Sequence, residues 1–216
     1  MTDLFAYLQE RPYPGRGILL GATPAGKSLI AYFIMGRSEN SRNRIFIEEK
    51  DGIRTEAHDP AKMEDPSLII YHPVRRSSLG TVITNGDQTD TIAENGDFRR
   101  ALMTREFEPD APNYTPRISA IMRDDGSFDL SILKRAGGGR CLREFFSYEG
   151  CDENTGSFIS TYQGPGEPLP SFAGEPVEVT MPSAEEVWAA LNFENKVSLW
   201  ALDGAAERIF NKNLGD

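Results

Sequence analysis

Short apolar segments of strand length, each closed by a turn signal, recur along most of this chain and restrict the folds open to it. Two hairpin signals stand out: Asp51-Gly52 lies between Ile47 and Ile53, and Asp124-Asp125-Gly126 lies between apolar residues 118–122 and 128–132. We expect further strands at 17–21, 29–35, 68–71, 81–84, 158–162 and 177–179. The pattern predicts a core of largely antiparallel sheet.

Helical signals are fewer. Residues 4–8 are compatible with one short helical turn, and residues 98–107 have helical spacing after Asp97, a plausible N-cap. The firmest signal is the capping box at 183–186, because Ser183 and Glu186 can each satisfy a free backbone N–H. Apolar residues then continue at helical spacing and predict one long helix or two abutting helices through Trp200. We expect one α+β domain over residues 1–216, with helices packed outside the sheets.

Composition and charge exclude several classes of protein. The longest apolar run, 29–35, is too short to cross a bilayer, and the N-terminus lacks a secretory pattern, so we expect a cytoplasmic protein with no membrane association. The net charge of −10 arises from residues 144–216, which hold 13 acidic and 3 basic residues. No basic field covers the chain, which argues against nucleic acid as a partner. Cys141 and Cys151 fit no zinc spacing.

One motif invites a phosphate-loop interpretation. Residues 21–28 match G-x-x-x-x-G-K-[ST] in every fixed position. A true phosphate loop opens a helix, whereas residues 29–35 are apolar and branched like a buried strand. We therefore predict a hairpin here and keep a nucleotide hydrolase using Lys27 and Ser28 as an alternative. A second alternative is an N-terminal Thr2 nucleophile exposed by removal of Met1.

Three polar segments follow the predicted strands, where binding groups are commonly displayed. The first, 36–44, carries Arg37, Arg42 and Arg44 among small hydroxyl and amide residues, a pattern suited to a phosphate. The second comprises residues 71–76 and 84–94, and its density of Thr, Asp and Glu exceeds the needs of a turn. The third, 113–118, leads Arg117 into a strand.

In this order, the three segments resemble the archaeal-type IMP cyclohydrolase family. The likeness is carried by Gly36-Arg37-Ser38 with Arg42 and Arg44, by Asn85-Gly86-x-x-Thr89-Asp90-x-Ile92-x-Glu94, and by Tyr114-Thr115-Pro116-Arg117-Ile118. The resemblance implies ring closure of 5-formamidoimidazole-4-carboxamide ribonucleotide to inosine monophosphate (IMP). It also implies a four-layer α/β/β/α fold similar to N-terminal-nucleophile hydrolases, and no metal or organic cofactor. A purine ribonucleotide is thus the expected small-molecule partner, and we expect a homo-oligomer.

The chemistry and the resemblance together suggest roles for ten residues. As catalytic residues we predict Arg37, Tyr71, Glu94 and Asn85, with Tyr71 as proton relay or oxyanion donor and Glu94 as base or amide-orienting carboxylate. As substrate-binding residues we predict Ser38, Arg42, Arg44, Thr89, Asp90 and Arg117. A regulator that binds purine nucleotides without turnover is the main alternative.

Overall fold

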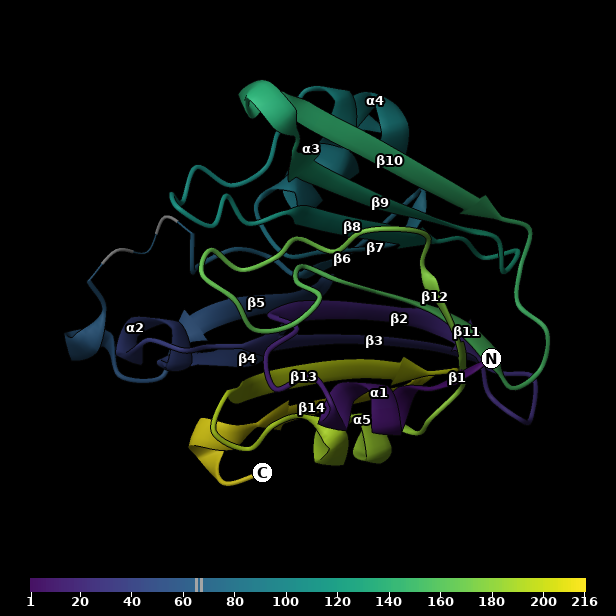
Figure 1. The fold of residues 1–216 in the computed structure, drawn as a ribbon. Coiled ribbons are helices and arrows are strands. Elements are labelled where there is room, and N and C mark those ends of the chain that lie inside the picture. The colour runs from purple at the N-terminus through teal and green to yellow at the C-terminus, as the bar shows by residue number, and fades with distance from the viewer. Residues whose placement is uncertain (65, 67) are drawn as a thin grey trace.

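Two seven-stranded sheets packed face to face form the body of the protein in a computed structural model, which describes residues 1–64, 66 and 68–216 (Figure 1). The first sheet has the order β1-β12-β11-β2-β3-β13-β14 and is antiparallel except for the β1–β12 pair. Its strands are β1 (Thr2–Asp3), β2 (Arg16–Ala22), β3 (Ser28–Met35), β11 (Thr155–Ser160), β12 (Val177–Thr180), β13 (Lys196–Asp203) and β14 (Ala206–Asn211).

In the second sheet every strand lies beside its neighbour in the sequence, in the order β10-β9-β8-β7-β6-β5-β4. All of these pairs are antiparallel. The strands are β4 (Arg44–Glu49), β5 (Gly52–Ala57), β6 (Val74–Ser77), β7 (Gly80–Thr84), β8 (Arg117–Met122), β9 (Phe128–Arg135) and β10 (Cys141–Tyr148). Short connections join β4 to β5, β6 to β7, β8 to β9 and β9 to β10, whereas longer segments connect β5 to β6 and β7 to β8.

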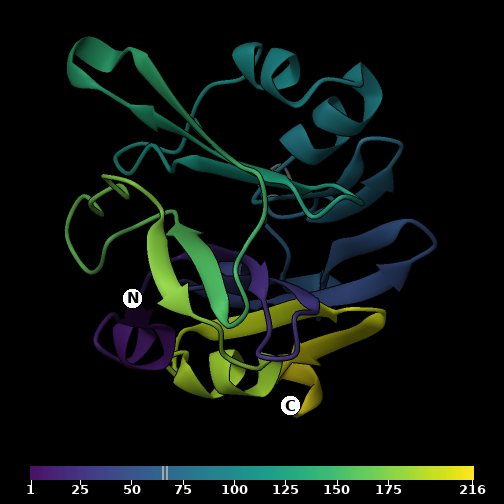
Figure 2. The ribbon, with the colours of Figure 1, turned by 90° about the vertical axis from the view of Figure 1, so that its right-hand side faces the viewer.

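Helices cover the outer faces of the two sheets (Figure 2). The first sheet carries α1 (Leu4–Gln9) and α5 (Ala184–Ala190), and the second carries α3 (Gln88–Asn95) and α4 (Phe98–Met103). Short helical segments also occur at α2 (Glu39–Arg42), η1 (Pro60–Lys62), η2 (Gly137–Gly139) and η3 (Lys212–Leu214). A buried cluster that includes Tyr32, Phe46 and Trp200 fills the space between the sheets. The predicted α+β class with largely antiparallel sheets is confirmed.

The segment that matches a phosphate loop is a hairpin. Strand β2 ends at Ala22, β3 begins at Ser28, and the two strands pair antiparallel from Arg16–Ile34 to Ala22–Ser28. The turn is closed by a backbone hydrogen bond from the Thr23 N–H to the Lys27 carbonyl, 2.8 Å long. Because no helix follows Lys27, the backbone N–H groups that would cradle a phosphate are absent at this point.

Several other predicted elements are confirmed with adjusted boundaries. Both hairpins form, as β4–β5 and β8–β9. The helix expected from residue 98 ends at Met103 rather than at 107, and the Asp97 carboxylate caps it by accepting the Arg100 N–H at 2.7 Å. The capping box of α5 is also present, with the Ser183 hydroxyl and the Glu186 carboxylate in reciprocal hydrogen bonds.

Two predictions are wrong. The C-terminal helix ends at Ala190, and Val197, Leu199 and Trp200 belong to strand β13. This strand is buried on both faces, so its run of apolar residues does not alternate and resembles a helical pattern. Residues 68–71 form a turn and a bend instead of a strand. Helix α3 and strands β10 and β14 were not anticipated.

No helix in the described part of the chain combines the length and the apolar character required to span a membrane.

Candidate functional site

A polar cavity of about 290 Å³ opens where the ends of both sheets meet. The first sheet contributes Arg16 at the start of β2, Met35 at the end of β3 and Tyr162 just after β11. The second sheet contributes Arg44 at the start of β4 and Thr115 just before β8. Strand ends from distant parts of the sequence therefore converge on one site.

Two arginines form the inner wall of the cavity. Arg44 is 1% exposed, and its guanidinium donates to the carbonyls of Ser41 (2.8 Å) and Met35 (3.2 Å). Burial and the nearby positive charge of Arg16 lower the pKa of Arg44. The Nε of Arg16 is buried and has no hydrogen-bond partner among the described residues. Because an unmet buried donor costs about 1–3 kcal/mol, this geometry favours a bound acceptor in the cavity.

The rim of the cavity carries Arg37 and Ser38. The exposed Arg37 guanidinium lies 4.9 Å above the centre of the Tyr13 ring. Ser38 caps α2, where its hydroxyl accepts the Ser41 N–H at 3.1 Å. Arg37, Ser38 and Arg44 are thus brought together around one cavity, as the sequence predicts.

Arg42, by contrast, points away from the cavity. Its Nε donates to the Gly36 carbonyl at 3.0 Å, and its Nη2 donates to the Asn195 Oδ1 at 3.2 Å. The side chain lines a separate hollow with His58 and Lys62 on the other side of α2. Of the three arginines in segment 36–44, only two face the cavity.

Tyr71 is buried near Arg16 and Arg44 but does not itself line the cavity. Its hydroxyl shares a 2.8 Å hydrogen bond with the hydroxyl of Tyr32 on β3. The Tyr71 backbone is fixed by the Thr55 hydroxyl, which accepts the Tyr71 N–H at 2.8 Å. Burial and the adjacent Tyr71 raise the pKa of Tyr32 against the charges of Arg16 and Arg44, so Tyr32 stays protonated at neutral pH and can donate.

Glu108 is a candidate residue that the sequence analysis missed. Its side chain is 2% exposed, and the Asn85 Nδ2 donates to its Oε1 at 3.5 Å. Burial raises the pKa of Glu108 to about 6, although the positive charges of Arg16 and Arg117 oppose the shift. Burial lowers the pKa of Arg16, but the Glu108 carboxylate together with the nearby Tyr13, Tyr71 and Tyr162 raises it above its usual value. No pattern in the sequence distinguishes Glu108 from the nearby acidic residues Glu106 and Asp110.

Asn85 and Arg117 brace this buried carboxylate. The Asn85 Oδ1 accepts the Ile118 N–H (2.8 Å) and the Gln88 side-chain amide (3.0 Å), while its Nδ2 donates to the Pro116 carbonyl (2.9 Å). The Arg117 Nη1 donates to the Gln88 Oε1 at 2.6 Å and pairs with Asp87 at 2.7 Å. These contacts fix the segment that leads into β8 and hold both residues buried near Glu108.

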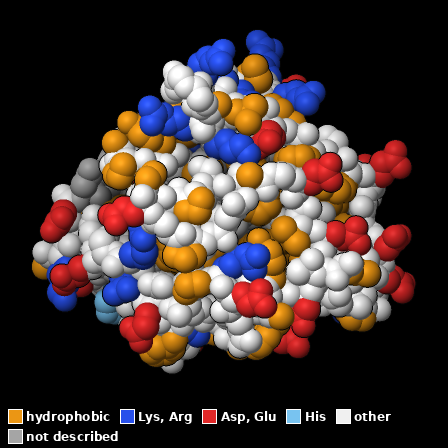
Figure 3. Space-filling model, in the orientation of Figure 1, with side chains coloured by type: hydrophobic (Ala, Val, Ile, Leu, Met, Phe, Trp, Pro, Cys, Tyr) orange, Lys and Arg blue, Asp and Glu red, His pale blue; other side chains and the backbone are white. Residues whose placement is uncertain are grey.

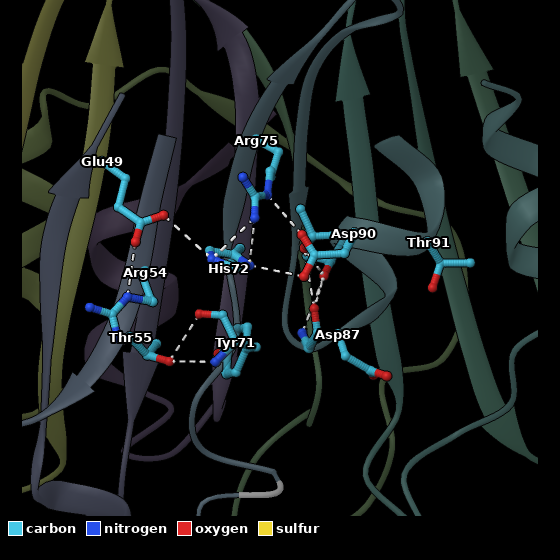
Figure 4. Close-up of polar contacts among 12 residues, drawn as sticks. Glu49, Arg54, Thr55, Tyr71, His72, Arg75, Asp87, Asp90 and Thr91 are labelled. Atoms are coloured by element: carbon cyan, nitrogen blue, oxygen red, sulfur yellow. Dashed lines mark hydrogen bonds and ion pairs between the residues drawn. The ribbon is translucent and has the colours of Figure 1, made fainter. Parts of the chain in front are cut away.

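Three predicted residues on α3 do not line the cavity. The Thr89 hydroxyl is buried 2.6 Å from that of Thr84, and Glu94 lies on the exposed side of the helix. Asp90 belongs to a surface network, in which it contacts His72 Nδ1 (2.9 Å) and Arg75 Nε (2.7 Å). Figure 4 shows this network extending from His72 to Glu49. That Thr89, Asp90 and Glu94 contact substrate stays a prediction. The contacts observed for Thr89 and Asp90 are with other side chains of the protein.

The alternative nucleophile lies far from the cavity. Thr2 pairs with Val179, which pairs with Gly156, which pairs with Gly21 near the end of β2. Arg16, at the cavity, begins that same strand. Within the described residues, no group of three or more His, Cys, Asp or Glu side chains is placed to hold a metal ion.

Taken together, the fold and the cavity define an α+β protein with an arginine-lined cavity between its two sheets and a buried carboxylate nearby. Comparison with known protein families identifies the family to which the chain belongs. A family model described as "IMP cyclohydrolase-like protein" matches residues 13–207, and the chain therefore belongs to this family.

Similar curated proteins are archaeal. The chain is 25% identical over 124 residues to a protein named IMP cyclohydrolase from Methanococcus aeolicus, covering 54% of this chain and 61% of the relative. It is 32% identical over 118 residues to a protein of the same name from Methanopyrus kandleri, covering 50% of this chain and 58% of the relative. The alignments thus span about three fifths of the length of these relatives.

Proposed function

We propose that this protein is an IMP cyclohydrolase that closes the pyrimidine ring of 5-formamidoimidazole-4-carboxamide ribonucleotide to give IMP and water. The name of its relatives supports this assignment. The observation that carries it is the arginine-lined cavity together with Glu108, a buried carboxylate with a pKa of about 6 that lies near Arg16 of the cavity wall but does not itself line the cavity. The Nε of Arg16 has no hydrogen-bond partner among the described residues.

The phosphate of the substrate is assigned to Arg37, Ser38 and Arg44. Arg37 is free to swing from the Tyr13 ring toward an anion at the rim, and the buried Arg44 supplies fixed positive charge within. Charge-assisted hydrogen bonds of this kind contribute about 1.5–3 kcal/mol each. They would hold the nucleotide so that its carboxamide and formyl groups meet inside the cavity.

Ring closure requires two proton transfers. The carboxamide nitrogen attacks the formyl carbon and loses one proton, and the formyl oxygen leaves as water with that proton and a second one from the formamide nitrogen. We assign the base to Glu108, which is mostly ionised at pH 7 and is oriented by Asn85. The Tyr32–Tyr71 hydroxyl pair is assigned as donor to the oxygen as its negative charge develops.

Glu94 is not given the role of base in this proposal, because it is exposed on α3, whereas Glu108 is buried close to Arg16 of the cavity wall. Arg117 acts by holding the buried surroundings of Glu108 rather than by touching substrate. The helices on both outer faces support the further inference of an α/β/β/α sandwich related to N-terminal-nucleophile hydrolases, with catalysis moved away from the N-terminus.

The test is absorbance-monitored conversion of the formamido ribonucleotide to IMP by the purified protein, with and without a chelator. Turnover unaffected by chelator is expected. No turnover, combined with stabilisation of the protein against heat by the nucleotide, would favour a regulator that binds without reacting. The absence of both turnover and binding would overturn the proposal.

A further inference from the structure

We propose that Asp110 and Tyr162 form the wall of the cavity that binds the ribose hydroxyls of the nucleotide, and that they select nucleotides that carry these hydroxyls. This inference rests on the proposed function and concerns a part of the substrate to which the arginines and Glu108 are not assigned. Both residues line the arginine-lined cavity together with Thr115. The hydrogen bonds among the three side chains fix which groups of this wall donate and which accept.

The Asp110 carboxylate sets the direction of these hydrogen bonds. The Thr115 hydroxyl donates to its Oδ2, and the Thr115 N–H donates to its Oδ1 at 2.6 Å. Because a hydroxyl has a single proton, the Thr115 oxygen can only accept from the Tyr162 hydroxyl, which lies 2.6 Å away. Tyr162 therefore donates its proton to Thr115, and its oxygen is left as an acceptor toward a ligand.

Burial maintains this direction. Thr115 and Tyr162 are 1% and 2% exposed. Burial raises the pKa of Tyr162 to about 12, although the positive charge of Arg16 opposes the shift, so the hydroxyl keeps its proton at neutral pH. A carboxylate has about four acceptor sites, and the two hydrogen bonds from Thr115 leave others of Asp110 unoccupied. Asp110 and Tyr162 thus present acceptors to the cavity, which suit a ligand with hydroxyl donors.

The two acceptors are held in place by their surroundings. The Tyr162 ring stacks on the Tyr13 ring with centroids 6.0 Å apart. It also approaches Gly15 so closely that a Cβ at Gly15 would lie 2.6 Å from the Tyr162 Cδ2. The Asn113 N–H donates to the Asp110 carbonyl at 3.0 Å and closes the turn that carries the carboxylate. Fixed acceptors that need a substrate hydroxyl disfavour an analogue without it, because they are then left unpaired.

The donors of the nucleotide decide which of its groups this wall binds. Apart from the phosphate, IMP carries N–H or O–H donors only at the ring N1 and at the ribose 2′- and 3′-hydroxyls. The proposed mechanism assigns N1 to Glu108, because this nitrogen loses a proton to the base during ring closure. The ring carbonyl is an acceptor and suits Arg16, whose Nε has no partner among the described residues. The two ribose hydroxyls are the donors that remain for Asp110 and Tyr162.

The distribution of charge favours entry of an anionic nucleotide at this end of the molecule. Helix α2, which Ser38 of the cavity rim caps, lies at the left of Figure 1, as do the loops 109–115 and 163–171. In the same orientation Asp and Glu side chains crowd the right-hand edge (Figure 3). The cavity therefore opens away from the most acidic part of this face, where repulsion of a phosphate is weaker.

The experiment compares the affinities of the full chain for IMP and for 2′,3′-dideoxy-IMP, which lacks both hydroxyls, by isothermal titration calorimetry. The wild type is expected to bind IMP about tenfold or more tightly than the dideoxy analogue. Asp110→Asn should weaken IMP binding by about tenfold and change the affinity for the analogue less than about twofold. In this variant the new amide donates to the Thr115 oxygen, so Thr115 donates to Tyr162, and the Tyr162 hydroxyl becomes a donor toward the cavity.

Tyr162→Phe is the second test, because it keeps the ring stacked on Tyr13 and removes only the acceptor. It should also weaken IMP binding while leaving the affinity for the analogue unchanged. Asp124→Asn, the same substitution at an exposed position between β8 and β9, is the matched control and should change neither affinity. Circular dichroism and thermal unfolding confirm that each variant is folded.

Two results would overturn this inference and leave the proposed function standing. One is a wild type that binds IMP and the dideoxy analogue equally well. The other is an equal loss of affinity for both nucleotides in Asp110→Asn and in Tyr162→Phe, as expected if these residues only support the cavity. A wild type that binds neither nucleotide would overturn the proposed function together with the inference that rests on it.

Discussion

The ionisation of Glu108 is set by two opposing influences. Burial favours the neutral acid, while Arg16 and Arg117 favour the carboxylate, and the balance leaves a pKa of about 6. A group poised near neutral pH is an efficient proton acceptor. Glu108→Gln should therefore lower kcat by about 10²–10⁴-fold with little change in KM. Glu94→Gln is the matched control, and steady-state absorbance kinetics should show near wild-type values for it.

The same pKa predicts how activity depends on pH. The carboxylate form of Glu108 is the base, so kcat/KM should fall as pH drops through about 6 and reach a plateau above it. A rate profile between pH 5 and 8 is the measurement. The residual activity of Glu108→Gln should lack this acidic limb. If the limb persists in that variant, another group titrates and the assignment of the base fails.

Arg37 and Arg42 belong to one segment but should behave differently. Arg37→Ala removes a guanidinium from the cavity rim and should raise KM by about tenfold or more, as expected for the loss of a charge-assisted hydrogen bond. Arg42→Ala should change KM less than twofold, since that guanidinium is already bonded to Gly36 and Asn195. Equal effects of the two substitutions would contradict the proposed phosphate site.

Comparing Arg37 with Arg42, and Glu108 with Glu94, shows which site residues can be predicted from the sequence. The density of arginines in 36–44 predicts a shared phosphate site, and Arg37 and Arg44 do line one cavity whereas Arg42 faces away from it. Phosphate binding by these residues stays a prediction. The place of Glu108 depends on burial and on Arg16, which lies 92 positions away along the chain. No local sequence pattern predicts that Glu108 and Arg16 lie close together in the fold.

At the scale of elements, the β2–β3 hairpin makes a sharp prediction for the phosphate-loop motif. Lys27 is exposed in a hairpin turn, at the end of β2 opposite to Arg16. Lys27→Ala should leave kcat and KM within about twofold of wild type, as is usual for surface positions. Magnesium-dependent release of phosphate from a nucleoside triphosphate, lost in Lys27→Ala, would contradict this expectation.

The strands that the sequence indicates are those with a clear local signal. The hairpins β4–β5 and β8–β9 carry Gly-containing turns between apolar segments, and both form. The sequence predicts a helix where β13 lies, because both faces of this strand are buried, by α5 and α1 on one side and by the second sheet on the other. Because β13 lies inside the sheet, between β3 and β14, and is covered on both faces, its sequence does not alternate between apolar and polar residues.

At the scale of the whole molecule, the cavity depends on the packing of one sheet against the other. Arg16, Met35 and Tyr162 come from the first sheet, and Arg44 and Thr115 come from the second or from its approach. A ligand that contacts both sets favours the folded arrangement of the two sheets together. Binding should therefore stabilise the molecule as a unit rather than one local segment.

Thermal unfolding with the product measures this coupling. IMP at about 100 times its Kd should stabilise the fold by about 2.7 kcal/mol, which corresponds to a rise in Tm of about 5–10 °C for a domain of this size. At the same IMP and protein concentrations, a tenfold higher Kd should leave Arg37→Ala with about half of this rise, whereas Arg42→Ala should retain it. A full shift in Arg37→Ala would locate the nucleotide elsewhere, because a ligand held between the sheets cannot lose its rim arginine without a loss of linked stability.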